Sequence, residues 1–403
     1  MTHGKLKAGY LVLSAINTIA TTYFFYFLFF YLRDRFQFGD QQNLWVSAFH
    51  GFIYIFAAWQ CGKFADRRGY VFSLKLGYAG LTFLMIVGAF LQSAPAVMVL
   101  VAVYSVILLF TWPALEALVS ERETQAGTQR MVGIYNCTWG GAAAVAYFTG
   151  GKLYQSLGKN AIFAVPAALF ALQFLITLWL DKYHDEVLAW AKPVEEKHHA
   201  PEATALKQPI SPKTFLTMAW LANPFAYIAM NTVLAVMPGL TNRFGLTAAE
   251  AGLFGSVWLF ARVTAFGLLW RWTAWHYRFR WLLTAFLVLI ASFVAILLSP
   301  SWPFAAFAQA TFGLASGLIY YSSLFYSMDV GESKGEHGGL HEAFVGVGIC
   351  VGPGVGAAAL HFAPNSPNAG TWAVSTLLMA GLVGLISVRA KSPNTKPQTP
   401  KSQ

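Results

Sequence analysis

The amino-acid sequence predicts an all-α membrane protein of about twelve transmembrane helices in two pseudo-symmetric bundles of six. Three observations predict this class: a composition short of charge, a series of long apolar stretches, and one long polar segment between two sets of six. Of the 403 residues, 57% are hydrophobic and 11% are charged. A soluble domain carries roughly 25% charged residues. With so few charges a soluble chain could not cover its own surface, so lipid must solvate most of this one.

The apolar stretches are assigned to spans by their length, because a helix needs roughly 20 apolar residues to cross a bilayer. In the first half of the chain the candidate spans are 8–32, 43–65, 73–92, 95–119, 131–152 and 160–181. In the second half they are 214–240, 248–272, 280–299, 302–328, 337–362 and 369–390. The fifth and eleventh stretches are rich in glycine and alanine, so their apolar signal is the weakest.

The polar segment 182–213 contains four prolines among charged residues, a composition typical of a linker. We therefore expect an N-terminal six-helix bundle over 1–181, a cytoplasmic linker over 182–213, a C-terminal six-helix bundle over 214–391 and a cytoplasmic tail over 392–403.

A short similarity between the two halves indicates an internal repeat. Arg35-Phe36 follows the first span and Arg243-Phe244 follows the seventh. Duplicated halves are a common transporter architecture.

The positions of lysine and arginine predict the orientation, because cytoplasmic loops carry an excess of both. With the N-terminus in the cytoplasm, 21 of the 27 basic residues lie inside, five lie outside, and Arg262 lies mid-span. We expect a multi-pass integral protein of the plasma (inner) membrane with both termini cytoplasmic. The net charge of +10 follows from this topology and does not indicate a nucleic-acid partner.

The loop between the second and third spans carries a motif. It reads Gly62-Lys63-Phe64-Ala65-Asp66-Arg67-Arg68-Gly69. This resembles the cytoplasmic signature of the major facilitator superfamily, which places a glycine, an Asp-Arg pair and a second glycine between the same two spans. The usual basic pair after the second glycine is replaced here by Tyr70-Val71. The plan of six spans, linker and six spans resembles the superfamily across the whole chain.

The resemblance implies a gate made by Gly62, Asp66, Arg67 and Gly69. Asp66 and Arg67 would lock the two halves in one state and release them in another. The alternative is that the basic residues of the loop only hold the topology.

The first, fourth, seventh and tenth spans line the central cavity in members of the superfamily. In this chain polar residues recur at helical spacing in the first, seventh and tenth of these. The candidate substrate-binding residues among them are Asn17, Thr21, Tyr227, Asn231, Ser316 and Tyr320. The alternative is that these groups form hydrogen bonds between helices, as such side chains often do in membranes.

Arg262 is the one basic residue in the middle of a span. It lies about ten residues from the cytoplasmic end of the eighth span, or roughly 15 Å deep. A charge near the bilayer centre costs at least about 2.5–3.5 kcal/mol on insertion scales. We expect Arg262 to bind an anionic group, such as a carboxylate or phosphate, with Trp258 one turn earlier as a substrate wall. The alternative is a structural pair with a carboxylate or with backbone carbonyls.

Two titratable residues are candidates for proton coupling. Glu116 lies near the cytoplasmic end of the fourth span, about 10 Å shallower than Arg262. It could instead pair with a loop base such as Arg130. His50 in the second span is the other candidate, since histidine titrates near neutral pH, with a purely structural role as its alternative.

These features predict a secondary active transporter that moves a small solute, with an organic anion as the candidate that Arg262 favours. The expected mechanism is alternating access coupled to protons or another ion, by a monomer in the lipid bilayer. We find no nucleotide-binding loop, nucleophile motif or metal-ligand spacing, so we expect no catalytic residues, no metal and no cofactor. The alternatives are a membrane-embedded transferase and a non-transporting receptor or assembly protein on the same fold.

Overall fold

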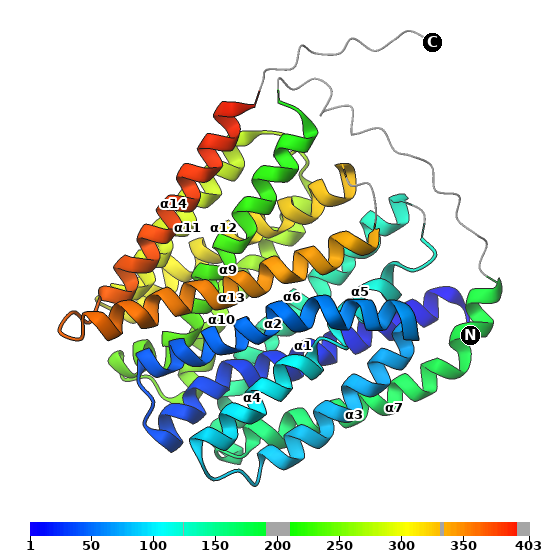
Figure 1. Cartoon of the computed structure of the whole chain (residues 1–403), viewed down its shortest axis with the longest axis horizontal. Coiled ribbons are helices and arrows are strands. Elements are labelled where there is room, and N and C mark those ends of the chain that lie inside the picture. Colours follow the sequence, from blue (N-terminus) through cyan, green and yellow to red (C-terminus); the bar gives the residue numbers. More distant parts are fainter. Residues whose placement is uncertain (124, 191–209, 331–333, 393–403) are drawn as a thin grey trace.

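The computed structural model describes residues 1–123, 125–190, 210–330 and 334–392. The first half contains α1 (His3–Phe36), α2 (Asp40–Arg68), α3 (Tyr70–Gly88), α4 (Ala94–Leu108), α5 (Trp112–Ser120), α6 (Gln125–Leu157) and α7 (Ala161–Trp190). The second half contains α9 (Pro212–Arg243), α10 (Ala248–Arg271), α11 (Phe279–Leu297), α12 (Trp302–Val330), α13 (Lys334–Phe362) and α14 (Ala369–Lys391). Because α4 and α5 form one crossing, each half crosses six times, which confirms the predicted class (Figure 1).

The predicted spans coincide closely with these helices. By length and composition, ten of the helices in the described ranges are apolar enough to cross a membrane. The other two long helices, α6 and α12, carry glycines where other helices approach them closely, at Gly151 and Gly313 for example. Helix α7 continues to Trp190, so it covers the first residues of the segment expected to be a linker. The rest of that segment up to residue 209, and the tail from residue 393, lie outside the described residues.

The fourth span is not the continuous helix that the sequence analysis predicted over 95–119. The amides of Leu109, Phe110 and Thr111 each bond to the carbonyl three residues earlier, at 3.2, 3.1 and 3.0 Å. This is the tighter 3₁₀ pattern that often ends an α-helix. Pro113 has no N–H to donate to the preceding turn. Helix α4 therefore ends at Leu108, and α5 begins at Trp112.

The two halves repeat the same helix pairing, as a duplicated architecture requires. In the first half α1 packs on α6 and α7, and α3 packs on α7. In the second half α9 packs on α13 and α14, and α11 packs on α14. Each of these pairs recurs six membrane crossings later along the chain, so the bundles are pseudo-symmetric.

The Arg-Phe similarity between the halves has a structural counterpart. Gln37 after α1 has φ +59°, and Gly245 after α9 has φ +69°. Arg35 donates to Gln92 in the α3–α4 loop, and Arg243 donates to the carbonyls of Leu297 and Ser299 around the α11–α12 loop. Both halves thus end their first helix with a left-handed residue and with an arginine bound to the loop between their third and fourth crossings.

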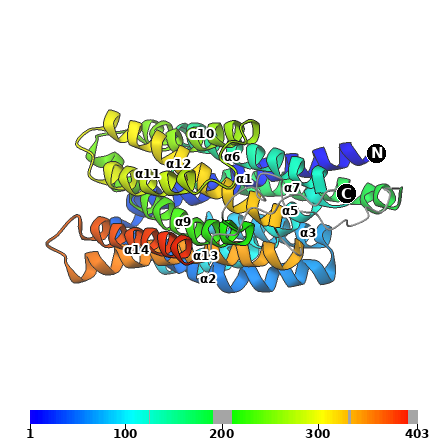
Figure 2. The same ribbon diagram turned by 90° about the horizontal axis from the view of Figure 1, so that it is seen from above.

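The halves meet along two lateral seams (Figures 1 and 2). Helices α2 and α13 run side by side on one seam, and α6 and α10 pack together on the other. A side chain on Gly51 would collide with the backbone of Cys350, and one on Gly151 with the backbone of Ala248. Small residues at these points let the helix backbones approach closely, as is typical of membrane interfaces.

The bundle has two ends. We call the end with the start of α1 and the end of α14 the terminal face, and the other end the opposite face. Three hydrogen bonds join the halves at or near the opposite face. The Tyr26 hydroxyl donates to the Ala251 carbonyl (2.9 Å), Arg33 Nη1 donates to the Pro238 carbonyl (2.9 Å), and the Ala249 amide donates to Gln155 Oε1 (3.2 Å). Among the described residues these bonds hold the two halves in contact at the opposite face.

Candidate functional site

Helix α10 buries the Arg262 guanidinium among three aromatic rings. The side chain is 3% exposed. Its Cζ atom lies 4.8 Å from the ring centroid of Tyr320, 5.0 Å from that of Trp139 and 5.5 Å from that of Phe266. Such distances allow cation–π attraction, which is stronger where water is excluded. Trp139 comes from α6 in the first half, so both halves build this aromatic cage.

The guanidinium is only partly satisfied by its neighbours. Nη1 donates to the sulfur of Met230 at 3.5 Å, a weak acceptor. Nε and Nη2 are buried and make no short hydrogen bond among the described residues, and the neighbouring Tyr227 hydroxyl is a neutral acceptor within reach of the guanidinium. In the same part of the chain Arg262 forms no ion pair. A buried arginine normally has a charged acceptor for its fork of donors, and the described residues supply none.

The sequence analysis placed Trp258 beside Arg262 as a wall. In the structure the Trp258 ring faces Tyr147 (6.4 Å between centroids) and Phe312 (6.0 Å). The rings over the guanidinium are Trp139, Phe266 and Tyr320 instead. Phe266 could have been found from its spacing, one turn after Arg262 on the same helix face. Trp139 could not, because it comes from another helix in the other half.

Two carboxylates, one from each half, interact electrostatically with each other and with a tyrosine beside Arg262. Glu116 of α5 interacts with Glu342 of α13, and Tyr227 and Tyr320 interact with both Glu116 and Arg262. The Tyr54 hydroxyl donates to Glu342 Oε2 and so links α2 to α13. Both carboxylates are half-buried. Within the described residues Glu116 makes no ion pair, with Arg130 or with any other base.

Sequence reasoning missed Glu342. Its place near the start of the eleventh span was explained by the helix dipole, and no functional role was assigned to it. Its hydrogen bond to Tyr54 of the other half shows a second role, because the bond crosses between the bundles.

His50 is a buried residue of α2 with a defined hydrogen bond. Its Nδ1 lies 2.6 Å from Ser105 Oγ, and Ser105 Oγ in turn donates to the Val101 carbonyl at 2.6 Å. Because that hydroxyl proton is already used, Ser105 accepts and His50 Nδ1 carries a proton. The His50 ring lies 5.7 Å from that of Tyr54, and Tyr54 donates to Glu342. His50 is therefore connected to Glu342 through its ring contact with Tyr54 and the hydrogen bond that Tyr54 donates.

The other polar candidates mainly bond to backbone or neighbouring helices. Thr21 donates to the Asn17 carbonyl at 2.8 Å, Ser316 to the Gly313 carbonyl at 3.2 Å, and Asn231 to the Tyr227 carbonyl at 2.9 Å. Asn17 itself donates to Thr111 at 3.3 Å. Of the six candidates in the first, seventh and tenth crossings, the structure brings Tyr227 and Tyr320 to Arg262.

The loop motif lies at the terminal face, away from the aromatic cage. Gly69 has φ +95° and makes the turn between α2 and α3, which glycine adopts without strain. Asp66 and Arg67 are exposed, and Asp66 Oδ1 accepts a hydrogen bond of 2.8 Å from the Tyr70 hydroxyl. A Cβ on Gly62 would meet nothing within 4 Å.

The fold and site can now be compared with known proteins. A family model described as the Major Facilitator Superfamily matches residues 10–353 of this chain. The chain belongs to the Major Facilitator Superfamily. As a member it is a multi-pass integral membrane protein and a transporter of small-molecule solutes rather than an enzyme. No curated protein matches it by sequence.

Solved structures of superfamily members share the fold. The nucleoside transporter NupG has a TM-score of 0.66 and 14% identity, and the match covers 96% of this chain and 98% of NupG. A bacterial homolog of the human lysosomal transporter Spinster, in an inward-facing and unoccupied conformation, has a TM-score of 0.66 and 14% identity, with 96% and 95% coverage. At this identity the likeness concerns the fold alone.

Proposed function

We propose that the chain carries a small organic anion by alternating access, with Arg262 as the residue that binds the anionic group. The observation behind this is the guanidinium itself: it is 3% exposed, its donors have no charged acceptor among the described residues, and it is surrounded by three rings. A carboxylate or phosphate would satisfy those donors. Trp139, Phe266 and Tyr320 suit a substrate that also has a flat apolar part.

The arrangement of the halves supports alternating access as the mechanism. The cage and the carboxylates come from both halves, so rocking one half against the other would take the site apart on one side. The three bonds at the opposite face then mark one end state. From the distribution of basic residues we propose that the terminal face is cytoplasmic, with Gly62, Asp66, Arg67 and Gly69 acting there as a gate.

Charge around the site supports coupling to a cation. Arg262 contributes one positive charge, and Glu116 and Glu342 contribute two negative ones when both are ionised. A bound anion adds further negative charge, which is costly in a membrane interior unless a proton or metal cation enters with it. We propose Glu116, together with Glu342, as the coupling group, and His50 as a second titratable candidate behind Tyr54.

A thermal-shift screen of the purified protein tests the anion proposal. Each ligand pair should share its flat apolar part and differ in whether it carries an anionic group: neutral nucleosides against nucleoside monophosphates, and aromatic alcohols against aromatic carboxylates. Anionic members should raise the unfolding temperature of the wild type but not of Arg262→Gln. Arg271→Gln is the matched control, since Arg271 is an exposed arginine of the same helix. If anions stabilise Arg262→Gln as much as the wild type, Arg262 does not bind them.

A further inference from the structure

A cavity of about 180 Å³ opens at the opposite face, between the start of α2 and the second half of the chain. Its walls come from α2 in the first half and, in the second half, from α9, α11, α13, α14 and the loop between the last two. An apolar cavity of ~150 Å³ can hold benzene, so this cavity has room for a small molecule. None of the aromatic rings around Arg262 lines it, so it is separate from the aromatic cage.

Two walls of the cavity carry opposite charges. Asp40 is the first residue of α2, and Arg243 is the last residue of α9. Both line the cavity and interact electrostatically across the two halves. Among the described residues, however, neither of them forms an ion pair. The cavity therefore holds one charge of each sign, and the two do not neutralise each other by contact.

The Asp40 carboxylate is fixed in position, and its oxygens are available as acceptors. A Cβ on Gly239 would collide with both carboxylate oxygens, so Asp40 lies directly against the backbone of α9. Within the described ranges no group donates a hydrogen bond to this carboxylate. An ionised carboxylate has about four acceptor sites. A ligand with an ammonium group can use these sites.

The Arg243 guanidinium is anchored by one nitrogen only. Its Nη2 donates to the Leu297 carbonyl at 3.1 Å and to the Ser299 carbonyl at 3.0 Å. Nε and Nη1 donate to none of the residues that the structure describes. Anchoring by Nη2 orients the other donors, and an arginine fork suits an anionic group with two oxygens, such as a carboxylate.

The other lining residues combine neutral polar groups with apolar walls. Asn368 and Thr371 lie near the start of α14, and Thr232 lies on α9. Thr232 Oγ1 already donates to the Ile228 carbonyl at 2.8 Å, so toward the cavity it can only accept. The apolar wall is formed by Leu44, Val236, Leu240, Leu297 and Leu360. A few placed polar groups among apolar side chains are typical of small-molecule sites.

We propose that this cavity binds a small zwitterion of the amino-acid class, with its ammonium group on Asp40 and its carboxylate on Arg243. Arg243 would repel a ligand with positive charge only, and Asp40 would repel one with negative charge only. A neutral ligand would leave both protein charges unpaired. Asp40 precedes the predicted span 43–65, Arg243 follows the predicted span 214–240, and both are exposed. The ligand therefore enters from the water at the opposite face.

A zwitterion in this position would connect the two halves. Its two charged groups would contact α2 of one half and α9 of the other, and this is possible only while the halves are in contact at the opposite face. A ligand shifts an equilibrium toward the state that it binds more tightly. The zwitterion should therefore favour this state and slow transport as a regulator. Only this regulatory effect rests on the proposed alternating access; the binding site does not.

Thermal unfolding of the full-length purified protein tests the binding site. The probes are glycine, β-alanine and γ-aminobutyric acid, three zwitterions with increasing charge separation. The controls are ethylamine, propionate and propionamide, which carry one charge or none. A zwitterion should raise the unfolding temperature, and the controls should not. Asp40→Asn and Arg243→Gln should each raise its half-saturating concentration about tenfold or more. Asp185→Asn, an exposed carboxylate at the terminal face, should leave that concentration unchanged.

Cross-linking between the halves tests the regulatory effect. Gln155→Cys and Ala249→Cys, introduced into a chain without the native cysteines, replace two residues that a 3.2 Å hydrogen bond joins across the halves. The zwitterion that stabilises the protein should increase cross-linking of this pair, and Asp40→Asn should abolish the increase. Unchanged cross-linking in the presence of the bound zwitterion would overturn the regulatory effect.

Three results would overturn the binding site: no rise with any zwitterion, an equal rise with the singly charged controls, or an unchanged half-saturating concentration in Asp40→Asn. If Arg243→Gln does not fold, Asp40→Asn decides, because the Asp40 carboxylate accepts no hydrogen bond from the described residues. Arg262→Gln should keep the zwitterion effect, so a failure of the anion proposal leaves this result unchanged. Loss of the effect in Arg262→Gln with retention in Asp40→Asn would assign the binding to the aromatic cage and overturn this proposal.

Discussion

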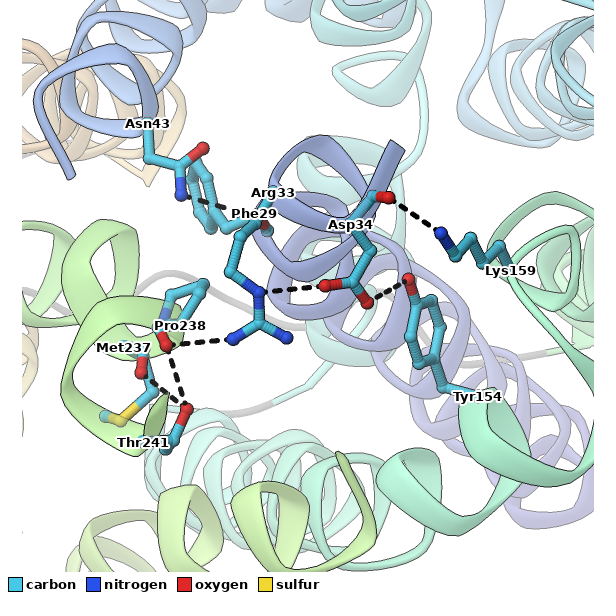
Figure 3. A network of polar contacts seen from close by, with 9 residues as sticks. All are labelled: Phe29, Arg33, Asp34, Asn43, Tyr154, Lys159, Met237, Pro238 and Thr241. Carbon is cyan, nitrogen blue, oxygen red and sulfur yellow. Dashed lines mark hydrogen bonds and ion pairs between the residues drawn. The ribbon is translucent and has the colours of Figure 1, made fainter. Parts of the chain in front are cut away.

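Arg33 of α1 donates a hydrogen bond from Nη1 to the backbone carbonyl of Pro238 in α9, at 2.9 Å, and so joins the two halves of the protein (Figure 3). The same guanidinium is held by its neighbour Asp34, whose Oδ1 lies 2.8 Å from Nε. Asp34 also accepts from the Tyr154 hydroxyl of α6 at 3.1 Å. The Arg33 side chain, oriented by Asp34 of its own half, thus contacts the other half at the opposite face.

Removing that side chain should loosen the opposite face. We expect Arg33→Gln to lower disulfide cross-linking between Gln155→Cys and Ala249→Cys, a pair that spans the halves by a 3.2 Å hydrogen bond. The three native cysteines would first be replaced. A loss of about 1 kcal/mol changes the balance between closed and open states roughly fivefold. Arg35→Gln is the control, because Arg35 bonds to Gln92 within its own half. Equal cross-linking in both variants would show that Arg33 does not hold the closure.

Close packing at Gly255 should be needed for the same closure. A Cβ there would collide with the Tyr26 hydroxyl, which donates to the Ala251 carbonyl across the halves. Overpacking of this kind costs about 1–3 kcal/mol, so Gly255→Ala should reduce transport and cross-linking together. Gly267→Ala on the same helix meets nothing within 4 Å and should behave as the wild type. Similar transport rates for the two alanine variants would rule out the steric argument.

The exposed loop motif gives a prediction about rate. Asp66→Asn should slow transport several-fold without reducing the amount of protein in the membrane, because it removes a charge from the proposed gate and weakens the bond with Tyr70. Initial uptake rates normalised to membrane-inserted protein measure this. Asp185→Asn, another exposed carboxylate at the end of α7, should leave the rate unchanged. An unchanged rate in Asp66→Asn would remove Asp66 from the gate.

Residues with a left-handed backbone conformation end α1 and α9, and substitutions at these two positions should change the unfolding temperature in opposite directions. Gln37 has φ +59° and Gly245 has φ +69°. A left-handed conformation costs a residue with a Cβ roughly 1–2 kcal/mol. Gln37→Gly should therefore raise the unfolding temperature, and Gly245→Ala should lower it. Gly141→Ala, at a helical glycine with open space around it, should change little or stabilise slightly. Stability changes of the same sign at both positions would contradict the equivalence of the two ends.

Much of the fold could be predicted from the sequence because bilayer thickness and loop charge are local constraints. The spans of α9, α10 and α14 were predicted to within a few residues for this reason. The break at Leu109–Thr111 was not predicted, since hydropathy averages over a stretch that is apolar on both sides of Pro113. The repeat after α1 and α9 was visible as Arg-Phe, but only the backbone angles show what it does.

The site was predictable only in part. The depth of Arg262 follows from its distance to the helix end, and that depth alone marked it. Which groups surround it depends on how two bundles meet, so Trp139 and Glu342 could not be found from spacing. Asn17 was predicted to be a substrate-binding residue of the first span. Its bond to Thr111 places it beside the break between α4 and α5, and no pattern along α1 could reveal that partner.

The most direct test of the central claim is accumulation of a radiolabelled organic anion, selected by the thermal-shift screen, in liposomes containing the purified protein. We predict uptake by the wild type and by Arg271→Gln, and uptake at the level of empty liposomes by Arg262→Gln. Binding of the same anion should be lost along with transport. Uptake by Arg262→Gln at the wild-type rate would contradict the claim that Arg262 binds the transported anion.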